Sequence, residues 1–130
     1  MSPRILKRSL LIALLSLLFA APLNAAQLTP LPRAEIEVLL SALEASGCRF
    51  NRNGSWHTAE EARMHLLRKL DYLEGKNAVQ NTERFIDLAA SASSVSGKEY
   101  LVQCGDTPPI TSKQWLLAQL ATIRSSAAVR

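Results

Sequence analysis

The side chains that could bind or transform a ligand gather in two short segments of the chain. Segment 52–57 carries an arginine, an asparagine and a histidine around an Asn-Gly turn, and segment 91–100 is rich in serine. An arginine presents a fork of donors that fits a carboxylate or phosphate. Hydroxyls and backbone amides in series can form an anion-binding nest. A simple solvated turn is the alternative. The predicted binding face consists of Arg52, Asn53, His57, Ser94, Ser96, Lys98 and Tyr100.

The serine run also raises the possibility of a small hydrolase. The candidate nucleophiles are Ser91, Ser93, Ser94 and Ser96. A nucleophilic serine needs a base within reach and an oxyanion hole, and the sequence has no Gly-x-Ser-x-Gly elbow. Serines that precede a glycine turn usually satisfy nearby backbone groups. We therefore predict no catalytic residue and keep a hydrolase as the second alternative.

The two histidines raise the possibility of a metal site. His57, Glu61 and His65 are spaced four residues apart, and residues at i and i+4 share one face of a helix. A structural zinc site takes four protein ligands, and a catalytic site takes three and a water. His57 precedes the predicted helix, Glu61 belongs to a capping motif, and no fourth ligand is evident. We predict neither a metal nor another cofactor.

The chain has two cysteines, Cys48 and Cys104. In an oxidising compartment, such a pair in a small domain most simply forms a disulfide. A catalytic thiol is the alternative, but the Cys-x-x-Cys spacing that would support it is absent from the sequence. We predict one disulfide.

The N-terminus has the three parts of a secretory signal peptide. Basic residues (Arg4, Lys7, Arg8) precede an apolar run from Leu10 to Ala21, and small residues follow up to Ala26. The run is short for a membrane-spanning helix, which needs about 20 apolar residues, so an uncleaved anchor is the weaker alternative. We predict a signal peptide over residues 1–26, cleaved after Ala25 or Ala26, and one periplasmic α+β domain over 27–130.

The charge balance argues against two classes of partner. Three of the 15 basic residues and none of the 11 acidic ones lie in the predicted signal peptide, so the mature chain would carry a net charge of +1. A near-neutral domain with few aromatic residues gives no electrostatic case for nucleic acid or for a membrane surface. The remaining partners are a protein or a small anionic ligand in the periplasm.

The first half of the mature chain predicts two helices around a hairpin. Apolar residues recur at helical spacing over Arg33 to Ser46, and Gly47 follows as a cap. Asn53-Gly54 predicts a type I′ turn within a hairpin over Cys48 to Thr58. Thr58-Ala59-Glu60-Glu61 is a capping box for a helix to about Glu74, closed by Gly75, with Lys69 on its wetter side.

The second half predicts two more helices and a strand. Thr82 is expected to cap a helix over Glu83 to about Ala90, and a strand is expected over Glu99 to Cys104. Thr111-Ser112-Lys113-Gln114 resembles a capping box for a helix to about Arg124, before a frayed tail. The predicted fold is α+β, with about four helices packed on a three-stranded antiparallel sheet.

A series of motifs along the mature chain resembles the YfeK-like family of small exported bacterial proteins, a domain of unknown function. The resemblance implies export and a single domain, and it brings no reaction, ligand or residue role. Its motifs are Arg52-Asn53-Gly54, His57-Thr58, Ala62-x-x-His65-Leu66, Lys69, Thr82-Glu83-x-Phe85-Ile86 and Ala90-Ser91-x-Ser93-Ser94-x-Ser96-Gly97-x-x-Tyr100-x-Val102.

A shorter motif, Ser96-Gly97-x-x-Tyr100, resembles the loop that periplasmic lysozyme inhibitors insert into the enzyme's carboxylate-lined cleft. Lys98 would suit such a partner. Those inhibitors are rich in β-structure, whereas this chain is predicted to be rich in helix, and a short motif outside its structural context is weak evidence. We therefore expect an exported, non-enzymatic binding or interaction domain, with a lysozyme-inhibitor-like protein as the first alternative.

Overall fold

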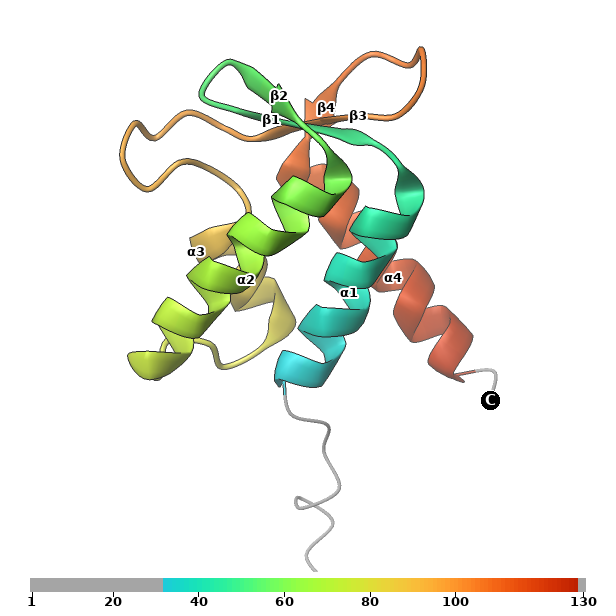
Figure 1. Cartoon of the computed structure of the whole chain (residues 1–130). Helices are drawn as coiled ribbons and strands as arrows, with labels where there is room; N and C mark the ends of the chain where they lie inside the picture. The colour runs from blue at the N-terminus through green and yellow to red at the C-terminus, as the bar shows by residue number, and fades with distance from the viewer. Residues whose placement is uncertain (1–31, 129–130) are drawn as a thin grey trace, which may run out of the picture.

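The protein folds into two layers, a small sheet and a set of helices that covers one of its faces (Figure 1). The computed structural model describes residues 32–128, so the predicted signal peptide lies outside the described residues. None of the helices among residues 32–128 is both long and apolar enough to cross a bilayer. The elements are α1 (Pro32–Ser46), β1 (Arg49–Arg52), β2 (Ser55–His57), α2 (Ala59–Gly75), α3 (Thr82–Ala89), β3 (Leu101–Gln103), β4 (Ile110–Thr111) and α4 (Ser112–Ala128).

The sheet has four strands in the order β2-β1-β3-β4, and all neighbours are antiparallel. The prediction of three strands was therefore wrong. The fourth strand, β4, pairs Ile110 with Val102 and Thr111 with Leu101. Two residues are too few to show the alternation of apolar and polar residues that reveals a strand in a sequence, and β4 runs directly into α4.

The hairpin between β1 and β2 was predicted correctly. Asn53 and Gly54 both have positive φ, 53° and 85°, which a type I′ turn requires at its two central positions. Arg52 then pairs with Ser55, and Phe50 pairs with His57. This turn places Arg52 and Asn53 at the end of the sheet beside α2.

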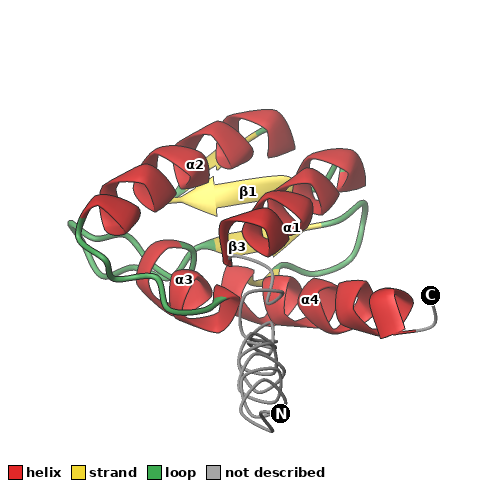
Figure 2. Cartoon of the chain, turned by 90° about the horizontal axis from the view of Figure 1, so that it is seen from below, coloured by secondary structure: helices red, strands yellow, loops and turns green. Residues whose placement is uncertain are grey.

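Helix α1 is the central helix of the lower layer and contacts α2, α3 and α4 (Figure 2). Its apolar residues Ile36, Leu39, Leu40 and Leu43 are all buried, as their spacing predicts. Gly47 takes a φ of 65° and ends the helix. The predicted disulfide is present and joins Cys48, just before β1, to Cys104, just after β3.

The ends of α2 agree with the prediction only in part. The Thr58 hydroxyl accepts a hydrogen bond from the Glu61 amide at 3.1 Å, so the cap is confirmed. The Glu61 carboxylate instead contacts Nδ1 of His57 at 3.0 Å. At the other end, Gly75 lies within the helix, and Asn77 takes the left-handed conformation with a φ of 53°. The prediction that Gly75 closes the helix was therefore wrong. The left-handed residue after the helix is Asn77, and asparagine tolerates this conformation as glycine does.

Two further helix boundaries differ from the prediction. The side chain of Asn81, rather than Thr82, caps α3 by accepting from the Arg84 amide, while Thr82 is buried and donates to Glu35. Helix α4 continues to Ala128, so the expected tail is helical over 125–128. The capping box at the start of α4 is confirmed, because Thr111 and Gln114 exchange hydrogen bonds in both directions.

Candidate functional site

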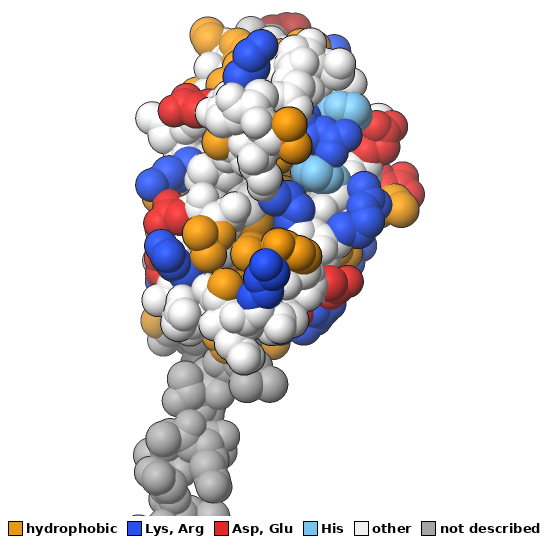
Figure 3. Space-filling model, turned by 90° about the vertical axis from the view of Figure 1, so that its left-hand side faces the viewer, with side chains coloured by type: hydrophobic (Ala, Val, Ile, Leu, Met, Phe, Trp, Pro, Cys, Tyr) orange, Lys and Arg blue, Asp and Glu red, His pale blue; other side chains and the backbone are white. Residues whose placement is uncertain are grey.

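A hollow of about 470 Å³ lies where the tip of the β1–β2 hairpin meets α2 and the serine-rich loop between α3 and β3. Figure 3 faces this side of the molecule and shows the histidines beside lysine and arginine side chains, with hydrophobic side chains next to them. The residues that line it are Arg52, Asn53, Ser55, His57, His65, Lys69, Ser93, Ser94, Val95 and Tyr100. We call this the cationic hollow.

Tyr100 forms the floor of the cationic hollow. It is 2% exposed, and its ring packs on Phe50 with the ring centroids 5.1 Å apart. Its hydroxyl lies 3.2 Å from Nζ of Lys69 and 3.4 Å from Nε2 of His65. Burial raises the pKa of the Tyr100 hydroxyl, so this group keeps its proton at neutral pH.

His65 is held between Arg52 and Tyr100. Nη1 of Arg52 lies 2.7 Å from Nδ1 of His65. The same Arg52 nitrogen lies 3.3 Å from Nε2. Because a guanidinium can only donate and Nδ1 is the nearer ring nitrogen, we assign Nδ1 as the acceptor and place the proton of the neutral ring on Nε2, facing Tyr100. Burial and then the charge of Arg52 lower the pKa of His65 from 6.5 to about 4. The imidazole is therefore neutral at pH 7.

Lys69 reaches the cationic hollow from α2, one turn beyond His65. Its ammonium group donates to the Tyr100 hydroxyl and, at 3.4 Å, to the carbonyl of Ala92. Burial and then the charge of Arg52 lower the pKa of Lys69. The assignment of Lys69 to the wetter side of α2 was wrong, because its side chain is partly buried against the serine-rich loop.

Arg52 and Lys69 differ from the other partly buried cations in lacking an acidic partner. Four basic side chains in segment 32–128 are partly buried. Arg33 and Arg63 contact carboxylates within 4.0 Å, whereas Arg52 and Lys69 contact none among the described residues. Partly buried charges are normally paired because desolvation is costly, so this unpaired cationic pair is unusual among the described residues.

The serine-rich loop is built by its own hydrogen bonds. The buried Ser93 hydroxyl accepts from the amides of Val95 and Ser96, both at 3.2 Å. Asn53 ties the hairpin tip to this loop, since its amide nitrogen donates to Ser93 at 3.4 Å and its oxygen accepts from Ser96 at 2.5 Å. These two serines therefore position the loop against the hairpin.

The structure brings together most of the predicted binding face. Arg52, Asn53, His57, Ser94 and Tyr100 line the cationic hollow. Ser96 adjoins the hollow through its hydrogen bond to Asn53, and Lys98 is exposed and is not part of the lining.

Five lining residues were missing from the predicted face: Ser55, His65, Lys69, Ser93 and Val95. Two of these, His65 and Lys69, carry titratable side chains. Their spacing of four residues puts them on the same face of α2, and this pattern was the available signal.

The geometry does not assemble the metal site or the serine nucleophile considered from the sequence. No group of three His, Cys, Asp or Glu side chains in the described part of the chain is placed to hold a metal ion. Arg52 donates to His65, and His57 is paired with Glu61. Among residues 32–128, no serine hydroxyl hydrogen bonds to either histidine. Ser91 donates instead to the Ile86 carbonyl.

The fold and this site define a small α+β domain with one disulfide and a cationic hollow. Comparison with known sequences gives the family. The chain belongs to DUF5329, a family of unknown function, whose model matches residues 30–124. The chain is also 43% identical over 68 residues to the uncharacterized protein YfeK of Salmonella typhimurium, which confirms the resemblance to the YfeK-like family. That match covers 52% of this chain and 55% of YfeK, so the chain spans about half the length of this curated relative. No solved structure matches the chain.

Proposed function

We propose that this protein is a non-enzymatic periplasmic binding domain that holds a small anion in the cationic hollow. The observation that carries the proposal is the pair formed by Arg52 and Lys69, which are partly buried and form no ion pair with a carboxylate among residues 32–128. An anion between them would supply the opposite charge that Arg33 and Arg63 receive from acidic side chains.

The distribution of protons also favours an acceptor-rich ligand. The Tyr100 oxygen accepts from Lys69 and from Nε2 of His65, so its own proton has no acceptor among the hydrogen bonds of the described residues. Arg52 and Lys69 have further N–H groups to donate. Phosphate and carboxylate oxygens accept such bonds, which are strong when the donor is charged.

The two alternative functions fit the geometry less well. In the lysozyme-inhibitor motif, Ser96 and Gly97 are exposed, but Tyr100 is buried and cannot extend into an enzyme's cleft. For a hydrolase, the hydroxyls of Ser91, Ser93 and Ser96 serve loop hydrogen bonds. A binding role requires no change in these serine hydrogen bonds.

Two features support export. The N-terminal 26 residues have the composition of a signal peptide. Cys48 and Cys104 form a disulfide, and disulfides persist mainly in oxidising compartments such as the periplasm. Fractionation of cells that produce the protein, with mass measurement of its mature N-terminus, tests this part of the proposal. Full-length protein in the cytoplasm would contradict it.

Isothermal titration of the oxidised protein with inorganic phosphate and with acetate tests the binding proposal. We expect saturable binding at one site. Arg52→Gln should weaken it at least about tenfold, because a hydrogen bond to a charged group contributes about 1.5–3 kcal/mol. Binding of neither anion, or equal binding by the variant, would overturn the proposal.

A further inference from the structure

A second hollow adjoins the cationic hollow on the side towards α3. Its volume is about 280 Å³. His65, Lys69 and Ser94 line both hollows, so the two spaces meet at these three side chains. The rest of its lining consists of Arg68, Tyr72, Leu73 and Leu88. We call it the apolar hollow.

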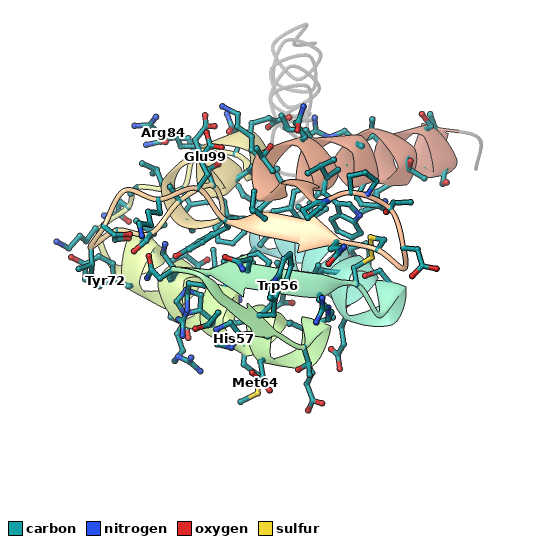
Figure 4. The ribbon with its side chains drawn as sticks, turned by 90° about the horizontal axis from the view of Figure 1, so that it is seen from above. Trp56, His57, Met64, Tyr72, Arg84 and Glu99 are labelled. Atoms are coloured by element: carbon teal, nitrogen blue, oxygen red, sulfur yellow. A yellow bond between two sulfur atoms is a disulfide. The ribbon has the colours of Figure 1, made fainter. Side chains whose placement is uncertain are left out.

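The apolar hollow differs in character from its neighbour. Leu73 and Leu88 are partly buried, and they come from α2 and α3. Tyr72 is 63% exposed at the end of α2 (Figure 4). Figure 3 shows hydrophobic side chains gathered next to the lysine and arginine side chains on this face. Exposed apolar surface at a hollow is typical of a ligand-binding groove.

We propose that the anion is the head group of an organic ligand whose short alkyl or aryl part lies in the apolar hollow. This inference rests on the proposed anion binding at Arg52 and Lys69. Lys69 lines both spaces, and its ammonium group contacts the Tyr100 hydroxyl in the cationic hollow. The ligand class is therefore an alkyl or aryl phosphate or carboxylate.

The size of the apolar hollow suits such a group. An apolar cavity of about 150 Å³ can hold benzene, and this hollow measures about 280 Å³. An aromatic ring or a chain of a few carbons therefore fits. Tyr72 offers a ring face for stacking, and the two leucines offer aliphatic contact.

Titration with methyl phosphate and with butyl phosphate tests the inference. Both probes present the same anion, and they differ only in their apolar part. Each fully buried methylene contributes about 0.8 kcal/mol, or about fourfold in affinity. We expect butyl phosphate to bind at least about tenfold more tightly than methyl phosphate. Leu88→Ser should remove most of this difference and leave methyl phosphate binding unchanged.

Two further variants separate the possible outcomes. Tyr72→Ala alters an exposed side chain of the apolar hollow. It should reduce the affinity advantage of butyl phosphate over methyl phosphate, even where Leu88→Ser fails to fold. Met64→Ala alters an exposed apolar residue elsewhere on α2 and should leave the affinity advantage of butyl phosphate unchanged. Equal affinity for the two phosphates would overturn this inference and leave anion binding standing. Failure of both phosphates to bind, together with failure of inorganic phosphate and acetate, would overturn the proposed function as well.

Discussion

His65 lies between two cations, and this position determines how the protein responds to acid. Arg52 donates to its ring at 2.7 Å, and Lys69 shares its contact with Tyr100. Burial and these charges lower the pKa of His65 to about 4, from 6.5. The unfolded chain therefore takes up a proton at a higher pH than the folded protein does. Linkage then requires that stability falls as the pH drops from 6.5 towards 4.

We predict that the free energy of unfolding is about 1 kcal/mol lower at pH 5 than at pH 7 because of His65, after discounting for its partial exposure. Urea denaturation at both values measures this difference. His65→Gln removes the titrating group, so its unfolding free energy should change less over the same range. An equal change in the variant would contradict the assignment to His65.

At the same scale, the sequence predicted the residues at the hairpin but not those on α2. Arg52 and Asn53 were found because an Asn-Gly turn fixes the local backbone, which is a property of neighbouring residues. His65 and Lys69 both contact Tyr100, which is 31 residues or more away in the sequence. Their spacing of four residues indicates a shared face of α2, but it does not indicate which distant residue that face contacts.

At the scale of elements, the serine-rich loop is a structural support for the hollow. The Ser93 hydroxyl binds two loop amides and the Asn53 side chain, whereas no hydrogen bond from the Ser94 hydroxyl occurs within residues 32–128, and Ser94 is exposed. Within the serine run, Ser93 is therefore a buried residue that connects the loop to the hairpin, and Ser94 is a surface residue.

Ser93→Ala should therefore lower the free energy of unfolding by about 1–3 kcal/mol, because it leaves the Val95 and Ser96 amides without their partner. Ser94→Ala should change it by less than about 0.5 kcal/mol. Chemical denaturation of both variants measures the difference. Equal stability of the two variants would show that the Ser93 hydrogen bonds do not hold the loop.

The elements were predictable where a local periodicity or capping motif is strong. The apolar spacing of α1 and the Thr58 cap of α2 were both confirmed. Strand β4 was missed because it is two residues long and pairs with a strand several residues earlier in the chain. The Thr82 cap was wrong because Asn81 offers an equally good capping side chain one residue earlier.

At the scale of the whole molecule, the disulfide and the ion pairs join different elements of the fold. Arg124 links α4 to Glu35 of α1 and Glu83 of α3, and Arg33 links α1 to Asp71 of α2. The Cys48–Cys104 bond closes a loop across 56 residues and joins the ends of β1 and β3. No acidic side chain among residues 32–128 lines the cationic hollow.

Replacing both cysteines with alanine should lower the free energy of unfolding by up to about 4 kcal/mol, because a long cross-linked loop restricts the unfolded chain. Thermal unfolding of the variant beside the oxidised protein measures the loss, and a reduced sample of the original protein serves as the control. No change in either sample would mean that the bond does not stabilise the domain.

The most direct test of the central claim is a phosphate titration of two charge-matched variants. Arg52→Gln with Lys69→Gln removes two charges from the cationic hollow, and Arg84→Gln with Lys113→Gln removes two exposed charges on α3 and α4. We predict that the first variant loses at least about tenfold in affinity and that the second stays within about twofold of the original protein. Equal losses in both variants would contradict a specific anion site at Arg52 and Lys69.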